Sequence, residues 1–253
     1  MAEAVSTHLP SDEERFASRK TLRMVLERGG WTVMALLLFV GLASVINRML
    51  FLAEAQSVAD PAAVYSAFDV RYAQLAVTSW LHLLPALIIA IAGPLQFVRA
   101  VRKRWPTWHR LAGRCYLIAG LVGATTGFII GGLNPFTGLS GPGFNEAVAT
   151  GVFSAYIIWA LAMAYLCVRR RDFARHREYM MRSWSLMMAI ATERILLLVL
   201  EVTTDVEIAI LFGTTFWLAG AINVAVVEAW ISLTRTPGRG FAHWKDLDQR
   251  ASA

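Results

Sequence analysis

The sequence predicts an all-α integral membrane protein, a six-helix bundle whose second to fifth helices form a core of two hairpins. Charged residues make up only 17% of the 253 residues, whereas a soluble domain carries about a quarter. Apolar runs of about twenty residues, the length that crosses the hydrocarbon core as a helix, recur along the chain. Basic residues gather in alternate linkers between these runs. Together these observations exclude an ordinary soluble domain.

Six runs have the required length, and we expect each to be a spanning helix. The fifth is the least regular, because Glu193 and Arg194 interrupt it. No pair of segments is broken by glycine at mid-depth, the pattern that marks many transporters. The expected spans are residues 31–52, 75–98, 107–132, 148–168, 183–201 and 207–233.

The linkers alternate sharply in charge. The first has only Arg71, the third has no lysine or arginine, and the fifth is acidic with Asp205 and Glu207, whereas the second, the fourth and both tails are basic. Lysine and arginine in short loops mark the cytoplasmic side. With six helices, both termini then lie in the cytoplasm of a bacterial inner membrane. The same distribution explains the pI of about 9.7 without a nucleic-acid partner. The partners we expect are anionic lipid headgroups and other membrane proteins.

Three regions follow from this topology. Residues 1–30 are expected to form a cytoplasmic tail. Residues 11–28 form either a short amphipathic surface helix that ends at Gly29 and Gly30, because glycine commonly terminates helices, or a partly ordered tail. Residues 31–233 form the transmembrane domain, and residues 234–253 form a cytoplasmic C-terminal tail.

Two basic segments resemble each other. "VRKRWPTWHR" at 101–110 aligns with "VRRRDFARHR" at 168–177 without a gap, at an offset of 67 residues. Each links two spanning segments and opens the next. We interpret the pair as a weak parallel repeat; chance likeness between two basic loops is the competing explanation.

Ionisable groups inside a spanning helix are costly and mark functional sites by default. His82 and Arg194 would lie on the order of 10 Å below the outer boundary at about 1.5 Å rise per residue. Arg48 is shallower, and its side chain could reach the headgroups. The candidate ligand-binding residues on the outer side are Arg48, His82, Glu193 and Arg194.

A second polar set lies toward the inner ends of the helices. Glu228 is expected to pair with Arg114 or Arg182, and arginines at helix ends commonly extend to headgroups without binding a ligand. This inner polar cluster comprises Arg110, Arg114, Arg182, Asn223 and Glu228.

His109 and His176 occupy matching positions in the two basic segments. Two imidazoles at one depth are the axial ligands that a b-type haem requires, and haem commonly occupies helical bundles. A histidine that bonds locally at the interface is the alternative. We therefore consider His109 and His176 as axial ligands of one haem b, with no other metal site expected.

The run "HLLPALIIAIAGPLQFVR" followed by "WHRLAGR" resembles the diheme transmembrane cytochromes b that ascorbate reduces. The resemblance implies a four-helix core formed by helices two to five, with histidines pairing between helices two and four and between helices three and five. Here the fourth expected helix has no histidine, and Tyr156 lies nearest the level of His82. The resemblance therefore implies at most one haem.

A resemblance that covers roughly residues 45 to 232 is to a large bacterial family of predicted membrane proteins of unknown function. It implies a topology and a short list of residues, but no chemistry. The residues that carry it are His82, Gly93, Pro94, Gln96, Phe97, His109, Arg110, Gly113, Arg114 and Tyr116, then His176, Arg177, Met180, Arg182 and Ser183 in "RHREYMMRSW", and Arg194, Asn223, Glu228 and Trp230.

Two classes of function fit these residues. The first is a redox or small-ligand protein, in which a quinone or an anion would suit the arginines and a haem the histidine pair. The second is a non-catalytic accessory or scaffold subunit of a larger membrane complex, in which the aromatic residues serve packing and interfacial anchoring. A transporter is a third option, favoured by the repeat but not by the absence of broken helices.

Overall fold

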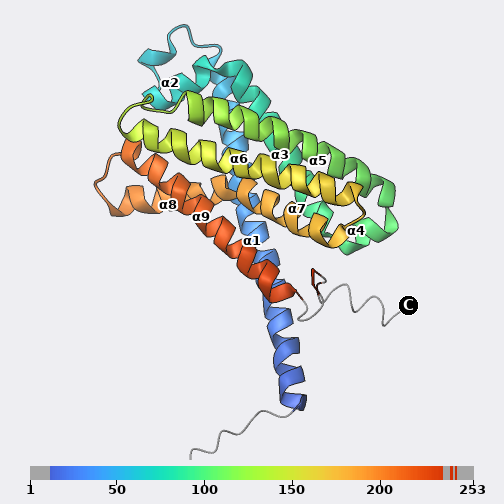
Figure 1. Ribbon diagram of the computed structural model, residues 1–253. Helices are drawn as coiled ribbons and strands as arrows, with labels where there is room; N and C mark the ends of the chain where they lie inside the picture. Colours follow the sequence, from blue (N-terminus) through green and yellow to red (C-terminus); the bar gives the residue numbers. More distant parts are fainter. Residues whose placement is uncertain (1–11, 236–239, 242, 244–253) are drawn as a thin grey trace, which may run out of the picture.

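The structure is a computed structural model that describes residues 12–235, 240, 241 and 243. All regular elements of this part are helices, and Figure 1 shows most of them packed into one bundle. Five helices within it are long and apolar enough to cross a membrane, which confirms the helical multi-pass class. They are α1 (Asp12–Ala55) from Met24 onward, α3 (Ala76–Phe97), α5 (Pro106–Gly127) with its continuation η2 (Phe128–Leu133), α6 (Pro142–Arg169) and α9 (Ile208–Thr234).

The N-terminal helix differs from its prediction. α1 is continuous from Asp12 to Ala55, so Gly29 and Gly30 lie inside it and do not end a separate surface helix. A side chain at Gly30 would place its Cβ 2.6 Å from the ring of Trp230. Glycine here permits close contact between α1 and the end of α9, a gain that offsets its cost of about 1 kcal/mol inside a helix.

The segment between α1 and α3 carries two short helices, η1 (Pro61–Ala63) and α2 (Ala67–Gln74). Ser66 caps α2 by accepting a hydrogen bond from the amide of Asp69, as hydroxyl residues do at helix starts. α2 places Tyr72 beside the spanning helices. At the other end of α3, α4 (Arg99–Arg104) leads into α5.

The fifth expected span is not one helix. α7 (Phe173–Met187) and α8 (Ala189–Thr203) are separated at Met188, so the prediction of an unbroken helix over 183–201 is wrong. In a continuous helix the carbonyl of Ser185 would accept from the amide four residues on. Here it accepts instead from Nδ2 of Asn223 at 2.7 Å. A side chain that enters the helical ladder in this way is a known cause of kinks.

Asn223 holds both sides of this break. The Ser185 hydroxyl donates to the Asn223 carbonyl at 2.9 Å, and the Thr192 hydroxyl donates to Oδ1 of Asn223 at 2.9 Å. The break has no glycine or proline nearby. Its cause is therefore a contact with α9, which comes later in the chain.

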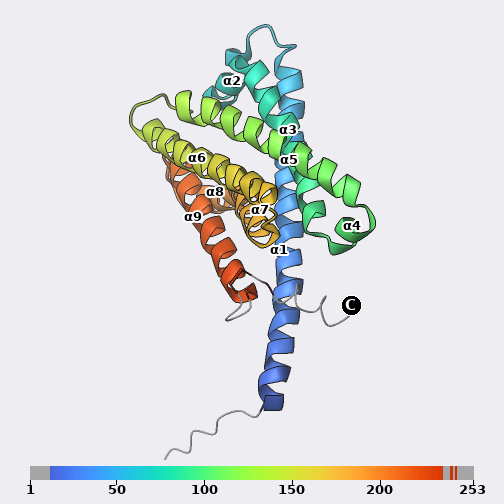
Figure 2. The ribbon, with the colours of Figure 1, turned by 45° about the vertical axis from the view of Figure 1, so that its right-hand side comes forward.

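α7 and α8 together follow α9 in the antiparallel direction. Arg182 pairs with Glu228 near one end, and Glu193 bonds Thr215 nearer the other. Figures 1 and 2 show α7 and α8 beside α9 along most of its length. The two short helices thus run beside α9 in the opposite direction.

The core is densest where α3, α5, α6 and α7 meet. Tyr116 and Trp184 are buried there, and the Tyr116 hydroxyl lies 3.1 Å from the hydroxyl of Ser183. A Cβ on Gly93 would lie 2.3 Å from the Trp184 ring. Small residues let spanning helices approach closely, so Gly93 is required by the indole that packs against it.

The two basic segments do not share a backbone conformation. The first forms most of α4 and the start of α5, whereas the second forms the end of α6, a turn in which Arg171 has a φ of 61°, and the start of α7. We call the end of the bundle that carries α4, residues 170–172 and Arg235 the basic end.

Candidate functional site

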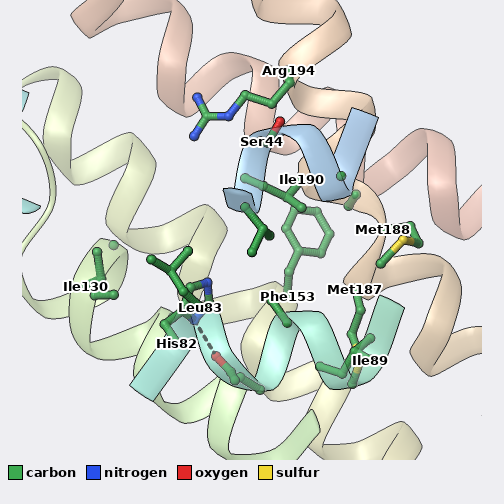
Figure 3. Close-up of a pocket in the computed structure, with 18 of the residues that line it drawn as sticks. Ser44, His82, Leu83, Ile89, Ile130, Phe153, Met187, Met188, Ile190 and Arg194 are labelled. Carbon is green, nitrogen blue, oxygen red and sulfur yellow. Dashed lines mark hydrogen bonds between the residues drawn. The ribbon is translucent and has the colours of Figure 1, made fainter. Parts of the chain in front are cut away.

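A cavity of about 430 Å³ lies between the helices, lined by residues of every spanning helix as well as of α2, α7 and α8. We call it the central cavity. Its walls are mostly apolar, including Leu83, Ile89 and Phe153, which Figure 3 shows around it. Pockets of roughly 300–1,000 Å³ with apolar walls and a few polar groups are typical of small-molecule sites.

Three of the four candidate residues from the outer set line this cavity. Arg48 comes from α1, His82 from α3 and Arg194 from α8. Figure 3 shows His82 and Arg194 reaching the space from different helices, with Ser44 of α1 near the arginine. The fourth, Glu193, does not line the cavity and is fully buried. The fold therefore brings together residues from distant parts of the chain.

The Arg48 guanidinium is held from several sides. It forms an ion pair with Asp69 of α2 and lies over the rings of Phe51 and Tyr72, 5.2 and 5.1 Å from their centroids. The ion pair and these cation–π contacts fix the guanidinium in place. Arg48 thus closes one end of the cavity as a structural group.

Arg194 is held much more loosely. Its Nε lies 3.5 Å from Oε2 of Glu193, and its guanidinium lies 5.6 Å from the centroid of Phe212. Glu193 accepts from the Thr215 hydroxyl through Oε1, while Oε2 has no hydrogen-bond partner within the described residues. Guanidinium carries five N–H donors, and the Nη donors of Arg194 make no hydrogen bond to a described residue. This cation is therefore available to an oxygen-bearing ligand.

His82 is oriented by α5. Its Nδ1 lies 3.0 Å from the carbonyl oxygen of Gly123 and 3.2 Å from the Thr126 hydroxyl, and Figure 3 draws the bond to the carbonyl. Cε1 of the ring would lie 3.1 Å from a Cβ on Gly127. The Nδ1 edge thus packs against α5, and Nε2 is the nitrogen not engaged there.

Among the polar residues of the cavity that sequence reasoning missed are Glu146 and Thr150 of α6. Glu146 accepts a hydrogen bond from the Phe136 amide at 2.8 Å. The expected fourth span began at residue 148, but α6 begins at Pro142, so Glu146 belonged to a loop in that prediction. Pro142 at the start of α6 was the available signal, since proline favours the first helical position. Thr150 is neutral and gave no signal; its buried hydroxyl has no partner in the described part of the chain.

Two irregular helical segments line the same cavity. The α7–α8 break contributes Met187, Met188 and Ala189, and the π-helical η2 contributes Ile130 and Gly131. π-helical turns occur often at functional sites, and interrupted helices line the substrate sites of many transporters. The sequence predicts no pair of segments broken by glycine, and the break at Met188 has no glycine beside it, so that criterion does not detect it.

Of the five residues expected to form the inner polar cluster, the structure pairs only two. Arg182 donates to both oxygens of Glu228, at 2.6 and 2.8 Å, so of the two expected partners Arg182 is the one that pairs. Asn223 belongs to the α7–α8 break, and Arg110 donates to Thr107 at 3.4 Å. Arg114 lies on α5 and forms no ion pair with Glu228 among the described residues.

Glu178 was missed as a member of this group. It is buried and accepts two hydrogen bonds from Arg235, at 2.7 and 2.6 Å, and lies 3.3 Å from Nε2 of His243. Arg182 is also 3.5 Å from it. We call Glu178, Arg182, Glu228, Arg235 and His243 the ionic cluster. Burial alone would raise the pKa of Glu178, but the hydrogen bonds from His243 and Arg235 lower that pKa to about 2.

The histidine pair lies apart from the cavity. Nδ1 of His176 is 2.9 Å from the carbonyl oxygen of Ala164, and Nδ1 of His109 is buried without a hydrogen-bond partner among the described residues. Neither lines the central cavity.

The chain was also compared with known proteins. The family described as "Predicted membrane protein (DUF2306)" matches residues 79–231. That range includes His82, Arg194, Asn223 and Glu228. No curated protein and no solved structure matches the chain.

Proposed function

This chain belongs to the DUF2306 family of predicted membrane proteins, and from that premise we propose that it binds a small, membrane-soluble ligand of the quinone class in the central cavity. The observation that carries the proposal is the meeting of His82 and Arg194 on one apolar cavity of about 430 Å³. A quinone has polar oxygens on opposite edges of an apolar ring, which suits a cavity with polar groups on two sides.

Different residues have different roles in binding the ligand. Arg194 donates hydrogen bonds to an oxygen of the ligand, because its Nη groups have no other acceptor among the described residues. Apolar side chains such as Ile89 and Phe153 enclose the ring and the start of its tail. Arg48 keeps Tyr72 and α2 in place at the cavity end through its contacts with Asp69 and the Tyr72 ring.

The same proposal includes a topology of six crossings with both termini in the cytoplasm. α7 and α8 follow α9 as one antiparallel course, which supports a sixth crossing made of two short helices. Gly30 of α1 lies against Trp230 near the end of α9, which supports both termini on one side. The positive-inside rule then assigns the basic end to the cytoplasmic face of the inner membrane.

Haem b fits the cavity less well. Bis-histidine ligation needs an imidazole on each face of the iron, but His82 is the one histidine among the lining residues, and His109 and His176 lie elsewhere. The proposed function therefore does not include haem. An absorption spectrum of the purified protein should show no Soret band; a stoichiometric band would contradict the quinone proposal.

The direct test is a titration of the purified protein in nanodiscs with a short-chain quinone, followed by quenching of tryptophan fluorescence. We expect saturable binding, weakened about tenfold or more in Arg194→Gln, since hydrogen bonds from a charged donor contribute about 1.5–3 kcal/mol. Arg169→Gln is the matched control, because Arg169 is exposed near the basic end and its hydrogen bond within the described residues is to Tyr165.

Absence of saturable binding in the wild-type protein would contradict the proposal. Stoichiometric co-purification of another membrane protein, together with no binding, would instead support an accessory role.

A further inference from the structure

We infer that the central cavity binds its ligand in the reduced, hydroxyl-bearing form, a hydroquinone, more tightly than the quinone, and that His82 makes this distinction. The inference rests on the proposed function. It concerns which redox form of the ligand the site prefers, and it follows from the hydrogen-bonding state of one imidazole.

The position of the proton on His82 is fixed by its neighbours. Nδ1 lies 3.0 Å from the Gly123 carbonyl oxygen, and a carbonyl oxygen can only accept a hydrogen bond. The Thr126 hydroxyl, 3.2 Å from Nδ1, is 2.7 Å from the Val122 carbonyl and donates its proton there. Both contacts therefore require Nδ1 to be the donor.

The remaining nitrogen is then an acceptor. A neutral imidazole that carries its proton on Nδ1 has a lone pair on Nε2. No carboxylate in the described part of the chain forms an ion pair with His82, so the ring has no counter-ion there for a second proton. No described residue donates to Nε2. The cavity therefore presents a hydrogen-bond acceptor on this side.

An acceptor on the cavity wall discriminates between the two redox forms once the ligand has displaced water from it. The O–H of a hydroquinone can donate to Nε2, whereas the carbonyl oxygen of a quinone would face the lone pair and leave it unsatisfied. An unsatisfied buried polar group weakens binding by on the order of tenfold to a hundredfold. A site built to bond a hydroxyl rejects the analogue that lacks it for this reason.

The opposite side of the cavity makes no such distinction. Arg194 is a donor, and both a quinone carbonyl and a hydroquinone hydroxyl have oxygen lone pairs that accept from a guanidinium. Loss of Arg194 should therefore weaken both forms alike. We assign the preference to His82, which α5 holds in place.

The preference has an electrochemical consequence. A site that binds the reduced form more tightly raises the midpoint potential of the bound couple relative to the free one. For a two-electron couple each tenfold preference corresponds to about 30 mV. We therefore expect a shift of about +30 to +60 mV for the bound ligand.

The experiment compares the affinities of one short-chain hydroquinone and its quinone for the protein in nanodiscs under anaerobic conditions. The wild-type protein should bind the hydroquinone about tenfold to a hundredfold more tightly. His82→Phe should lose the preference, because a phenyl ring neither accepts from the hydroquinone nor leaves an acceptor unsatisfied beside the quinone. Arg194→Gln should weaken both and keep their ratio.

A ligand-side control covers the case in which His82→Phe does not fold. The dimethyl ether of the same hydroquinone has no O–H donor, and the wild-type protein should bind it no more tightly than the quinone. Equal or tighter binding of the quinone, or of the ether relative to the hydroquinone, overturns the inference but leaves the proposed function standing. Failure of both redox forms to bind overturns the proposed function instead.

Discussion

The central cavity and the ionic cluster differ in how completely their charged side chains are hydrogen-bonded. In the cluster, Glu178 is bonded by Arg235 and His243, and Glu228 takes two hydrogen bonds from Arg182. In the cavity, Arg194 meets its neighbour Glu193 only at 3.5 Å.

The difference separates stability from binding. Buried charges that are fully bonded hold helices together, and removal of one partner is costly. Polar groups left without partners beside a cavity are costly to the fold, and they are retained where a ligand can satisfy them. We therefore expect substitutions in the cluster to affect folding, and substitutions in the cavity to affect binding.

The largest effect is expected for Glu178→Ala. Arg235 and His243 would lose their shared acceptor, and loss of one partner from a buried pair costs about 3–5 kcal/mol. Thermal unfolding followed by circular dichroism in detergent measures this. Glu228→Ala is the matched control and should cost less, because the Glu228 side chain is 43% exposed and that of Glu178 is 2% exposed. A larger loss from Glu228→Ala would contradict the central place of Glu178.

The same carboxylate predicts how the cluster responds to pH. Its pKa is lowered from 4.5 to about 2, so its contribution to stability is complete above pH 4.5 and is lost as the pH falls toward 2. The melting temperature should therefore change in wild-type protein between pH 4.5 and 2, and this part of the change should vanish in Glu178→Gln. An identical pH profile in the variant would exclude Glu178 as the titrating group.

A smaller effect is expected at the α7–α8 break. Asn223→Leu removes the donor to Ser185 and the acceptor of Thr192, so that buried polar groups lose partners at about 1–3 kcal/mol. The break borders the cavity, so this variant should lower both the melting temperature and ligand affinity. An Asn223→Leu protein with unchanged melting temperature would show that the break does not need its side-chain bonds.

The smallest effect is expected for Thr150→Val. The Thr150 hydroxyl is buried and has no partner among the described residues, so its replacement by a methyl group of similar shape should change stability by less than about 0.5 kcal/mol. Any change in ligand affinity then reports a contact between this hydroxyl and the ligand. A clear loss of stability would show that the hydroxyl is bonded within the fold. The cavity would then resemble the ionic cluster in that its polar groups already have partners inside the protein.

Much of the candidate site could be predicted because ionisable groups stand out in apolar segments. His82, Arg194 and Arg48 were found in this way, and they do line one cavity. Glu146 was assigned to a loop because the start of α6 was placed six residues too late, at 148 and not at Pro142. Glu178 was missed because it precedes the expected fifth span among several charged neighbours, where a carboxylate is unremarkable.

The sequence by itself determined the membrane class, five spanning helices and which residues would be costly in the bilayer, because hydropathy and charge are properties of a local stretch of chain. The tertiary structure alone decided that α7 and α8 are separate, that Glu178 is the centre of a cluster, and that His82 offers its Nε2 to a cavity. Each of these depends on a partner far away in the chain: Asn223 for Ser185, Arg235 for Glu178 and Gly123 for His82. Local patterns carry no information on such pairs, since they form only when distant helices pack together.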